Sequence, residues 1–331
     1  DTHRIGHWLI EDMAETEEDR YYMSVVSAGS GAEHTRMGCL NFSLYDRKRK
    51  APRFKQAGRG GIGTVFRDKH IKALVVKSEP VRGDSNHPAD PERVSQAGIR
   101  LHKEIHDHDD QQCKMRKTGT TYLVQIMSDY DLLPVHNFRY GSHPKAAQIS
   151  REVWEQRFTQ GLPDGCWYGC TLACAHAVDN YTVRTGPYKG ETVIVDGPEY
   201  ETIAGVGSNC GIFDPEAILE INFYCDTYGI DTISFGTGTA FIMECYEAGI
   251  LDKEKTGGLE LTFGNADAAI GNFDVLFRKQ LESLKATRAQ RDTGTGPQTS
   301  PAEWAVALLT RVKEAKGKEA VSYTHLTLPT N

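Results

Sequence analysis

The chain has 331 residues, of which 39% are hydrophobic, 25% charged and 9% aromatic, so it is long enough to form two or three domains with a sizeable core. No apolar run reaches the roughly 18 residues that a membrane-spanning helix needs, and the aromatic content excludes a wholly disordered chain. The formal net charge of −7 argues against a general nucleic-acid-binding protein.

The start of the chain and its cysteines bear on the compartment. The sequence begins at Asp1 without the basic and apolar segments of a signal peptide, and its eight cysteines are too few for a disulfide scaffold of this length. Three of them cluster tightly, which suits metal ligation in a reducing compartment better than disulfide pairing. We therefore expect a cytoplasmic protein.

Residues 20–77 are predicted to be mainly β-structure. Tyr21–Val26 and Cys39–Leu44 are rich in aromatic and β-branched residues, and Ile71–Lys77 is a short apolar run of strand length. The basic stretch Arg47–Lys55 lies between the second and the third of these and is not expected to form a buried strand. Three prolines within Glu79–Glu92 end the region, and we expect a domain boundary there.

From about Arg93 the pattern becomes helical. The best-marked helix has Asp214 as its N-cap, Pro215 at its first position and Gly229 at its end. Further helices are expected over Pro91–Met115, Ile149–Gln160 and Gly238–Glu247 and, after a polar linker, over Pro301–Lys316.

Cys166, Cys170 and Cys174 are the strongest single feature. Thiolates are soft ligands, and three within nine residues can hold zinc or an iron–sulfur cluster. In a helix, a spacing of four would place all three sulfurs on one stripe. The alternative is that three small apolar side chains face a core. Because no second cysteine pair completes a zinc site, an iron–sulfur cluster with its fourth ligand elsewhere is the better interpretation.

The segment Gly58–Gly63 (GRGGIG) formally contains the dinucleotide-binding pattern. That pattern requires a hydrophobic strand immediately before it, and the basic stretch there does not supply one. The loop, which leads into a short helix from Thr64, instead offers backbone amides beside cations and so suits a phosphate or pyrophosphate. A flexible surface turn beside a solvated basic face is the alternative.

Two acidic motifs give weaker signals. Glu201 precedes a stretch rich in glycines and could serve as a general base if burial raised its pKa, although an exposed acid in an ordinary loop is the simpler interpretation. Asp231 lies between two predicted helices, and on local evidence it is a helix cap.

Histidines give weaker signals still. His136 and His143 lie in a turn-rich stretch between helices, where their spacing does not indicate proton transfer. The group His102, His106 and His108 does not match a metal-binding signature and fits a solvated helix face.

Taken together and in order, these features resemble the tungsten-containing aldehyde:ferredoxin oxidoreductase family. The resemblance covers about residues 37–280. It rests on four stretches: GRGGIGTVFRDKHIKALVVKS, GCWYGCTLACAHAV, PEYETIAGVGSNCGIFDPEAILEINFYCDTYGIDTIS and GGLELTFGNADA. Each is weak singly, and the combination is specific.

The resemblance implies a set of cofactors and ligands. In this family two pterin dithiolenes chelate one tungsten beside a [4Fe–4S] cluster, with a magnesium ion bridging the pterin phosphates, and this cofactor carries out the redox chemistry. Cys166, Cys170 and Cys174 would ligate the cluster. Glu201 matches the active-site glutamate, and His136 and His143 are further catalytic candidates. The residues carried over to the pterin are Gly58, Arg59, Gly60, Gly61, Gly63, Asp226, Gly229, Ile230 and Asp231.

The sequence also departs from the family pattern. Three residues separate Cys166 from Cys170, where the family commonly has two. The motif that brings the fourth cluster cysteine is absent, as is the N-terminal part of the base domain, so we expect an internal fragment. The cysteine gap and the context of Cys210 favour the branch of tungsten subunits of class II benzoyl-CoA reductases. In that branch a protein cysteine ligates tungsten, and Cys210 is the candidate.

The implied fold is α+β. Residues 1–85 would be the C-terminal part of a β-rich pterin-binding domain, and residues 86–292 a mainly helical domain with the iron–sulfur and active-site motifs. Residues 293–322 would be a linker and the start of a truncated helical domain, and residues 323–331 a non-native tail.

The implied activity is oxidation of a small aldehyde to a carboxylic acid, with electrons passed to ferredoxin or to an iron–sulfur electron-transfer subunit. In the other branch the substrate is an aromatic acyl-CoA. A homo- or hetero-oligomer is expected, without nucleic acid or membrane insertion. Two other functions stay open, a non-catalytic iron–sulfur subunit and a zinc-stabilised binding module. The enzyme interpretation requires the cysteines and the glycine loop to enclose one centre, with Glu201 close by.

Overall fold

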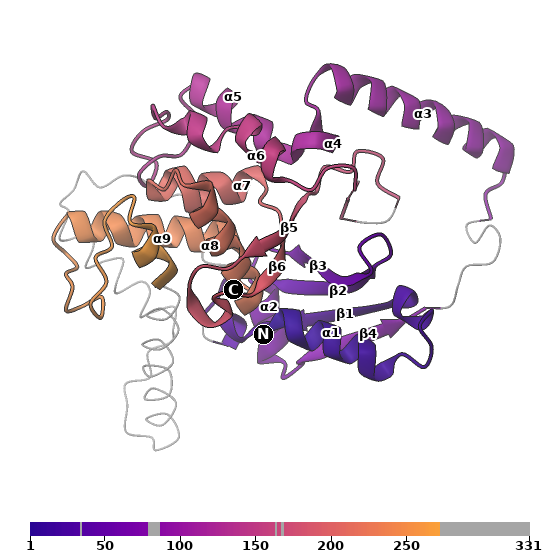
Figure 1. Ribbon diagram of the computed structural model, residues 1–331, viewed down its shortest axis with the longest axis horizontal. Helices are drawn as coiled ribbons and strands as arrows, with labels where there is room; N and C mark the ends of the chain where they lie inside the picture. Colours follow the sequence, from indigo (N-terminus) through magenta and orange to yellow (C-terminus); the bar gives the residue numbers. More distant parts are fainter. Residues whose placement is uncertain (34, 79–86, 163, 167–168, 272–331) are drawn as a thin grey trace.

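The structure is a computed structural model that describes residues 1–33, 35–78, 87–162, 164–166 and 169–271 (Figure 1). It combines antiparallel sheets with helices, which confirms the predicted α+β class. Several expectations lie outside the described residues. They are the domain boundary after residue 85, the linker and truncated domain of residues 293–322 with the helix over Pro301–Lys316, and the tail of residues 323–331.

Four antiparallel strands form the first sheet, in the order β3-β2-β1-β4. Their bounds are Met23–Ala28 (β1), Leu40–Asp46 (β2), Ala51–Ala57 (β3) and Ala73–Lys77 (β4). β1, β2 and β4 confirm the three predicted strands. One face of the sheet is covered by the helix α1 (Thr2–Met13), whose Ile10 packs on Met23 and Val25. No signal in the sequence had indicated α1.

β3 corrects the expectation that the basic stretch forms no buried strand. It pairs with β2 along its whole length, from Ala51 opposite Asp46 to Ala57 opposite Leu40. As an edge strand it tolerates Pro52, because one side of its backbone needs no partner in the sheet. Arg53 is nevertheless buried, because acidic side chains surround its guanidinium. Phe54 is also buried, and its ring meets that of His3. The strand was missed because its buried charge is neutralised by residues distant in sequence.

The helical region lies above the sheet in Figure 1, and α3 projects away from it. Short helices occupy Ile62–Asp68 (α2), Met115–Thr118 (α4), Leu123–Asp129 (α5), Arg151–Arg157 (α6) and Tyr200–Thr202 (α7). The longer ones are Pro91–Gln111 (α3), Pro215–Tyr228 (α8) and Thr232–Glu247 (α9). The prediction for α8 is confirmed in detail: the Asp214 carboxylate accepts a hydrogen bond from the backbone N–H of Glu216, and Gly229 ends the helix at φ +69°.

α9 begins six residues earlier than expected, at Thr232 rather than Gly238. The glycines at its start do not interrupt the helix. Gly236 is needed for space, because a Cβ at this position would lie 2.4 Å from the backbone of Gly205. Close helix packing, rather than helix termination, explains this glycine.

A second antiparallel sheet, β5 (Ala177–Thr182) with β6 (Thr192–Asp196), lies inside the region expected to be helical. The two strands are short and their register shifts between Val178 and Tyr181, so no regular alternation marks them in the sequence.

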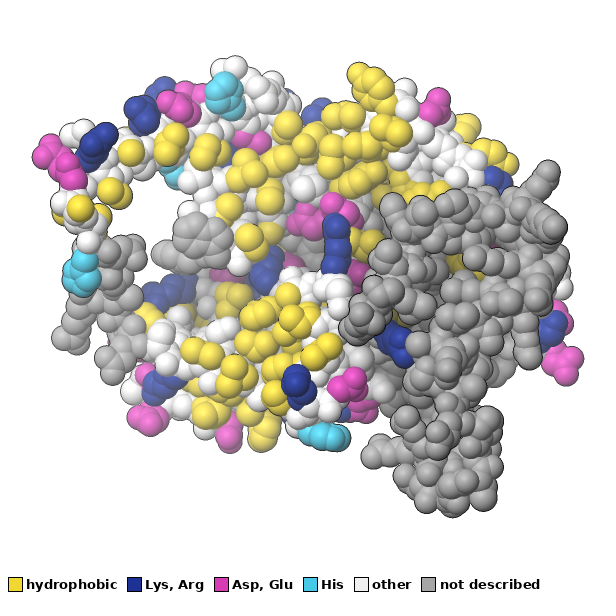
Figure 2. Space-filling view, turned by 180° about the vertical axis from the view of Figure 1, so that it is seen from behind, with side chains coloured by type: hydrophobic (Ala, Val, Ile, Leu, Met, Phe, Trp, Pro, Cys, Tyr) yellow, Lys and Arg dark blue, Asp and Glu magenta, His cyan; other side chains and the backbone are white. Residues whose placement is uncertain are grey.

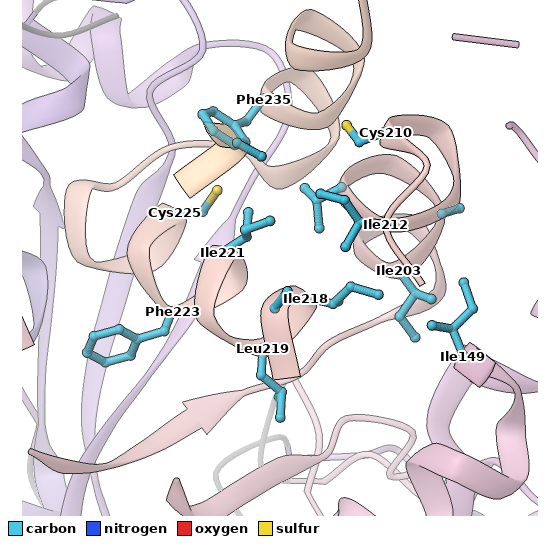
Figure 3. Close-up of a cluster of buried hydrophobic side chains, with 14 of the residues drawn as sticks. Ile149, Ile203, Cys210, Ile212, Ile218, Leu219, Ile221, Phe223, Cys225 and Phe235 are labelled. Carbon is cyan, nitrogen blue, oxygen red and sulfur yellow. The ribbon is translucent and has the colours of Figure 1, made fainter. Parts of the chain in front are cut away.

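The main hydrophobic core surrounds α8 (Figure 3). Ile218 and Ile221 of this helix meet Phe235 of α9, Ile203 and Ile212, all of which are at most 2% exposed. Every residue from 217 to 227 is buried, so the polar side chains on α8 are buried too and need partners. In the described part of the chain, no helix combines the length and the apolar character needed to cross a bilayer.

Candidate active site

A cleft of about 340 Å³ opens between β3, the cysteine segment and the start of α9. Its volume lies within the range of ordinary small-molecule pockets. Seen from behind, charged side chains of both signs gather in the hollow between the helical region and the sheet (Figure 2). Several residues predicted from the sequence line the cleft together, namely Gly58, Arg59, Cys166, Glu201, Asp226, Ile230 and Asp231.

Backbone pairing brings the glycine loop to the acidic motif. Gly38 forms an isolated β-bridge with Ile230, and the Cys39 N–H donates to the carbonyl of Gly229 at 2.9 Å. The N–H of Gly63 in turn donates to the carbonyl of Gly38 at 2.9 Å. The loop and the turn between α8 and α9 are thereby fixed to the same short segment.

The glycines in the loop are there for space and conformation. A Cβ on Gly63 would lie 2.1 Å from the carbonyl oxygen of Cys39, and one on Gly61 would lie 2.3 Å from that of Arg36. Gly61 also has φ +67° and Gly60 has φ +85°, which side-chain-bearing residues rarely adopt. The loop leads directly into α2, which begins at Ile62, two residues before the expected start.

Arg59 and Glu201 form an ion pair across the cleft, with 3.7 Å between Nη2 and Oε1. Both side chains keep contact with solvent, at 70% and 44% exposure, so the pair is loose and either partner can turn to a ligand. Glu201 lies in α7, directly before the π-helical turn Ile203–Gly207.

Asp226 lies at the bottom of the cleft, on α8. Burial raises the pKa of its carboxyl well above the usual value, and the nearby Asp196 raises it further. Asn222, one helical turn earlier, donates from Nδ2 to Asp226 Oδ2 at 3.2 Å. Because Asn222 Nδ2 also donates to the carbonyl of Asp196, both of its N–H groups are used within the protein. The two side chains therefore offer a ligand the Asn222 amide oxygen and the Asp226 carboxyl group.

The structure adds cleft residues that sequence reasoning missed, among them Lys55, Asp196 and Glu199. Burial raises the pKa of Glu199, although its carboxylate accepts a hydrogen bond from the Thr120 hydroxyl at 2.6 Å. Only Glu199 had a local signal, because it lies two residues before Glu201. Lys55 and Asp196 become neighbours through folding alone.

Over its described residues, 164–166 and 169–174, the cysteine segment contains no helix, so the expectation that the three sulfurs lie on one helix stripe is not met there. Cys166 is exposed and lines the cleft, whereas Cys170 and Cys174 are partly buried. The pKa of Cys174 is raised by burial and then by the charges of Glu199, Cys170 and Cys166. All three thiols are free. Within the described residues no three His, Cys, Asp or Glu side chains are arranged to hold one metal ion, so cluster ligation stays a prediction.

Cys210, His136 and His143 do not line this cleft. The Cys210 thiol is buried, and its Sγ contacts the carbonyls of Gly205 and Gly236 at 3.5 and 3.4 Å. His136 stacks on Phe263, with 4.6 Å between ring centroids, and His143 stacks on Phe213 at 4.4 Å. Burial lowers the pKa of both imidazoles.

Comparison with known proteins identifies the family. A family model described as aldehyde ferredoxin oxidoreductase, domains 2 and 3, matches residues 96–275, more than half of the chain. The chain belongs to the aldehyde ferredoxin oxidoreductase family. The resemblance drawn from the sequence is thus confirmed.

Several curated relatives are similar to this member of the family. A tungsten-containing aldehyde ferredoxin oxidoreductase of Pyrococcus abyssi is 32% identical over 64% of this chain, and one of Pyrococcus furiosus is 33% identical over 61%. An aliphatic sulfonate oxidoreductase, WOR-like subunit, of Pyrococcus furiosus is 30% identical over 64%. The alignments cover 33%, 31% and 32% of these relatives, so the chain spans about a third of their length.

A solved structure shares the fold. The active-site complex BamBC of benzoyl coenzyme A reductase, in complex with 1,5-dienoyl-CoA, matches with a TM-score of 0.52 at 18% identity. The match covers 81% of this chain and 38% of that one.

Proposed function

We propose that this chain is the part of a tungsten-pterin oxidoreductase that supplies three cluster cysteines, one pterin-phosphate loop and the active-site glutamate. One observation carries the proposal: a single cleft is lined by Gly58 and Arg59, by Cys166, by Glu201 and by Asp231. These residues come from four separate segments of the sequence. An unrelated surface turn, exposed acid and free thiol would have no reason to meet.

The residues of the cleft fit the proposed cofactor by their chemistry. Backbone amides of the loop after Gly58, together with Arg59, suit a phosphate. Asp226, Asn222 and Asp231 offer hydrogen-bond partners for a pterin ring, with Gly60, Gly61, Gly63, Gly229 and Ile230 shaping the backbone around it. Cys166, Cys170 and Cys174 offer thiolates for a [4Fe–4S] cluster. When bound, the tungsten–pterin group would supply the two-electron chemistry.

Glu201 is proposed as the general base beside the substrate. Its carboxylate is accessible from the cleft and is held by a single weak ion pair, so it can take a proton from a bound water or substrate. Arg59 is its ion-pair partner across the cleft, and the pair is loose enough for either side chain to turn to a ligand. His136, His143 and Cys210 have no contact with this cleft to support them, and their roles stay predictions.

Aldehyde oxidation with ferredoxin as acceptor is the proposed reaction, because relatives at 32–33% identity are named for it. Reduction of an aromatic acyl-CoA is the second candidate, favoured by the three-residue gap between Cys166 and Cys170. Activity on short aldehydes and on aromatic acyl-CoA thioesters, measured on the same full-length preparation, distinguishes the two. The same proposal includes the division into domains given above, assembly with an electron-transfer partner and a cytoplasmic location.

Glu201→Gln in the full-length protein tests the site. We expect the rate to fall by about 10²- to 10⁴-fold, the usual contribution of a positioned general base, with tungsten and iron content unchanged. Glu216→Gln is the matched control, because Glu216 is also a half-exposed, ion-paired glutamate, 3.2 Å from Arg157, but lies outside the cleft.

Measuring the metals bound by the full-length protein distinguishes the classes of function. Tungsten with iron supports the enzyme, iron without tungsten supports a non-catalytic electron-transfer subunit, and zinc alone supports a binding module. Full activity of Glu201→Gln would remove Glu201 from catalysis even if both metals are present.

A further inference from the structure

A buried guanidinium lies behind the cleft, on β3. The Arg53 side chain is 3% exposed and contacts three carboxylates: it is ion-paired with Asp164, its Nη2 is 2.5 Å from Asp196, and its Nη1 is 3.6 Å from Asp46. Lys55, two residues along the same strand, lies 2.5 Å from Asp196 and 3.4 Å from Asp164. The two cations therefore share the same pair of acids.

Asp164 stands at the base of the cysteine segment. It precedes Cys166 by two residues, and its backbone forms β-bridges with Cys174 and Ala175 at the other end of the segment. Its Oδ1 also accepts a hydrogen bond from the Gly165 N–H at 2.9 Å. Whatever holds Asp164 in place thus holds both ends of the segment.

Asp196 stands at the base of the glutamate segment. It is the last residue of β6, and the chain continues from it through Glu199 to Glu201. Its carbonyl accepts a hydrogen bond from Asn222 Nδ2 at 2.7 Å, which attaches it to α8 as well. One guanidinium accordingly touches the starting points of both functional segments.

We infer that Arg53 is a positioning residue that sets the cysteine segment and the Glu201 segment in fixed relation to each other and to the glycine loop. Arg53 belongs to β3, the strand that leads into Gly58, so all three walls of the cleft are joined at its side chain. The planar guanidinium of Arg53 binds the two carboxylates through different nitrogens, Nη1 to Asp164 and Nη2 to Asp196, whereas Lys55 contacts both through its single Nζ. The consequence for a bound cluster rests on the proposed function.

Arg49 provides a matched control within the same charge cluster. Its side chain is 5% exposed, its Nη1 is 2.9 Å from Asp46 and its Nε is 2.9 Å from Asp179. It therefore has the same charge, similar burial and two carboxylate partners, but these are Asp46 and Asp179 rather than Asp164 and Asp196. Replacing either arginine removes a buried guanidinium, but of the two only Arg53 contacts the cysteine segment and the Glu201 segment.

The experiment compares Arg53→Met, Arg53→Lys and Arg49→Met in the full-length protein. Iron and sulfide per chain, the cluster midpoint potential and amide hydrogen exchange are measured. We expect Arg53→Met to lose at least half of its iron, Arg53→Lys to recover it only in part, and Arg49→Met to match the wild type. Equal iron content and equal potential in Arg53→Met and Arg49→Met would overturn the inference. If Arg53→Met fails to fold, Asp164→Asn replaces it with the same expectation.

Hydrogen exchange separates this inference from the proposed function. The amides of Cys174 and Ala175 should exchange at least tenfold faster in Arg53→Met than in Arg49→Met, whether or not a cluster is bound. A wild-type protein without iron would refute the proposed function but leave this comparison intact. Unchanged exchange in an iron-loaded protein would refute the role of Arg53 alone.

Discussion

Asp231 combines two tasks in one carboxylate. It accepts hydrogen bonds from the backbone N–H groups of Ile233 and Ser234 at 3.2 and 3.1 Å, which makes it the N-cap of α9. The same side chain lines the cleft, and its Oδ1 would lie 3.4 Å from a Cβ on Gly58. The capping bonds fix the orientation of the carboxylate, with Oδ1 toward the glycine loop. Local sequence evidence had indicated the cap, and the family resemblance the site.

The glycine loop allows a prediction at single positions. Gly63→Ala should lower the free energy of unfolding by about 1–3 kcal/mol, because the new methyl group would meet the backbone of Cys39 at 2.1 Å. Gly98→Ala in α3 is the control: no atom lies within 4 Å of its Cβ position, and alanine is favoured in a helix by about 0.5–1 kcal/mol. Urea unfolding measures both, and equal stability of the two variants would show that the loop has room for a side chain.

The site was predictable from the sequence where a motif is contiguous. Gly58, Arg59, Glu201 and Asp231 were carried over from contiguous stretches that resemble the family, and they line one cleft. Lys55 was not, because its partner Asp196 is 141 residues away and nothing local pairs them. Ion pairs between distant segments are set by the fold rather than by spacing along the chain.

Helices and strands, too, were predictable only where their signals are local in the sequence. The signals for α8 are all local, a cap, a proline and a terminating glycine, and the helix was predicted with its correct ends. β3 and the β5–β6 hairpin depend on partners across the sheet, and the sequence indicated neither. The predicted start of α9 was wrong because the role of Gly236 depends on which backbone packs against it. Local chemistry sets helix ends, whereas packing decides strands and glycines inside helices.

The two helix caps give a prediction that separates stability from function. Asp214→Ala and Asp231→Ala should each lower the free energy of unfolding by about 1 kcal/mol, since each removes the side-chain acceptor at a helix N-terminus. Only Asp231→Ala should also reduce tungsten content, because Asp214 is not a cleft residue. Denaturant unfolding and metal analysis of both variants provide the check. Equal tungsten content in the two would limit Asp231 to its capping role.

At the scale of the whole molecule, α1 joins the sheet to the helical region. The Thr2 hydroxyl donates to the carbonyl of Asp226 at 2.5 Å, and the His3 Nε2 lies 3.0 Å from the Thr227 hydroxyl. The His3 ring stacks on Phe223 of α8, with 4.8 Å between centroids, and meets Phe54 of β3 edge-on at 4.4 Å. The imidazole thus lies at the seam between the two regions, directly behind the cleft.

The buried imidazole of His3 at this seam should make the free energy of unfolding sensitive to acid. Burial lowers the pKa of His3 to about 3 in the folded chain, although a backbone hydrogen bond with Phe223 acts in the opposite direction. Above the unfolded pKa of about 6.5 the imidazole is neutral in both states and has no effect. As the pH falls below that value only the unfolded chain takes up the proton, so stability is lost, by about 2 kcal/mol between pH 6.5 and pH 5.

His3→Gln tests this by removing the titrating ring while keeping a polar group for Thr227. The variant should be less stable than the wild type at pH 7, because stacking on Phe223 is lost, but its further loss on going to pH 5 should be smaller by about 2 kcal/mol. His7→Gln, on the same helix but with a half-exposed ring, should keep the pH dependence of the wild type. Urea unfolding at both pH values measures these differences. If all three proteins lose the same stability on acidification, the buried imidazole does not control the seam, and the acid sensitivity must come from groups outside it.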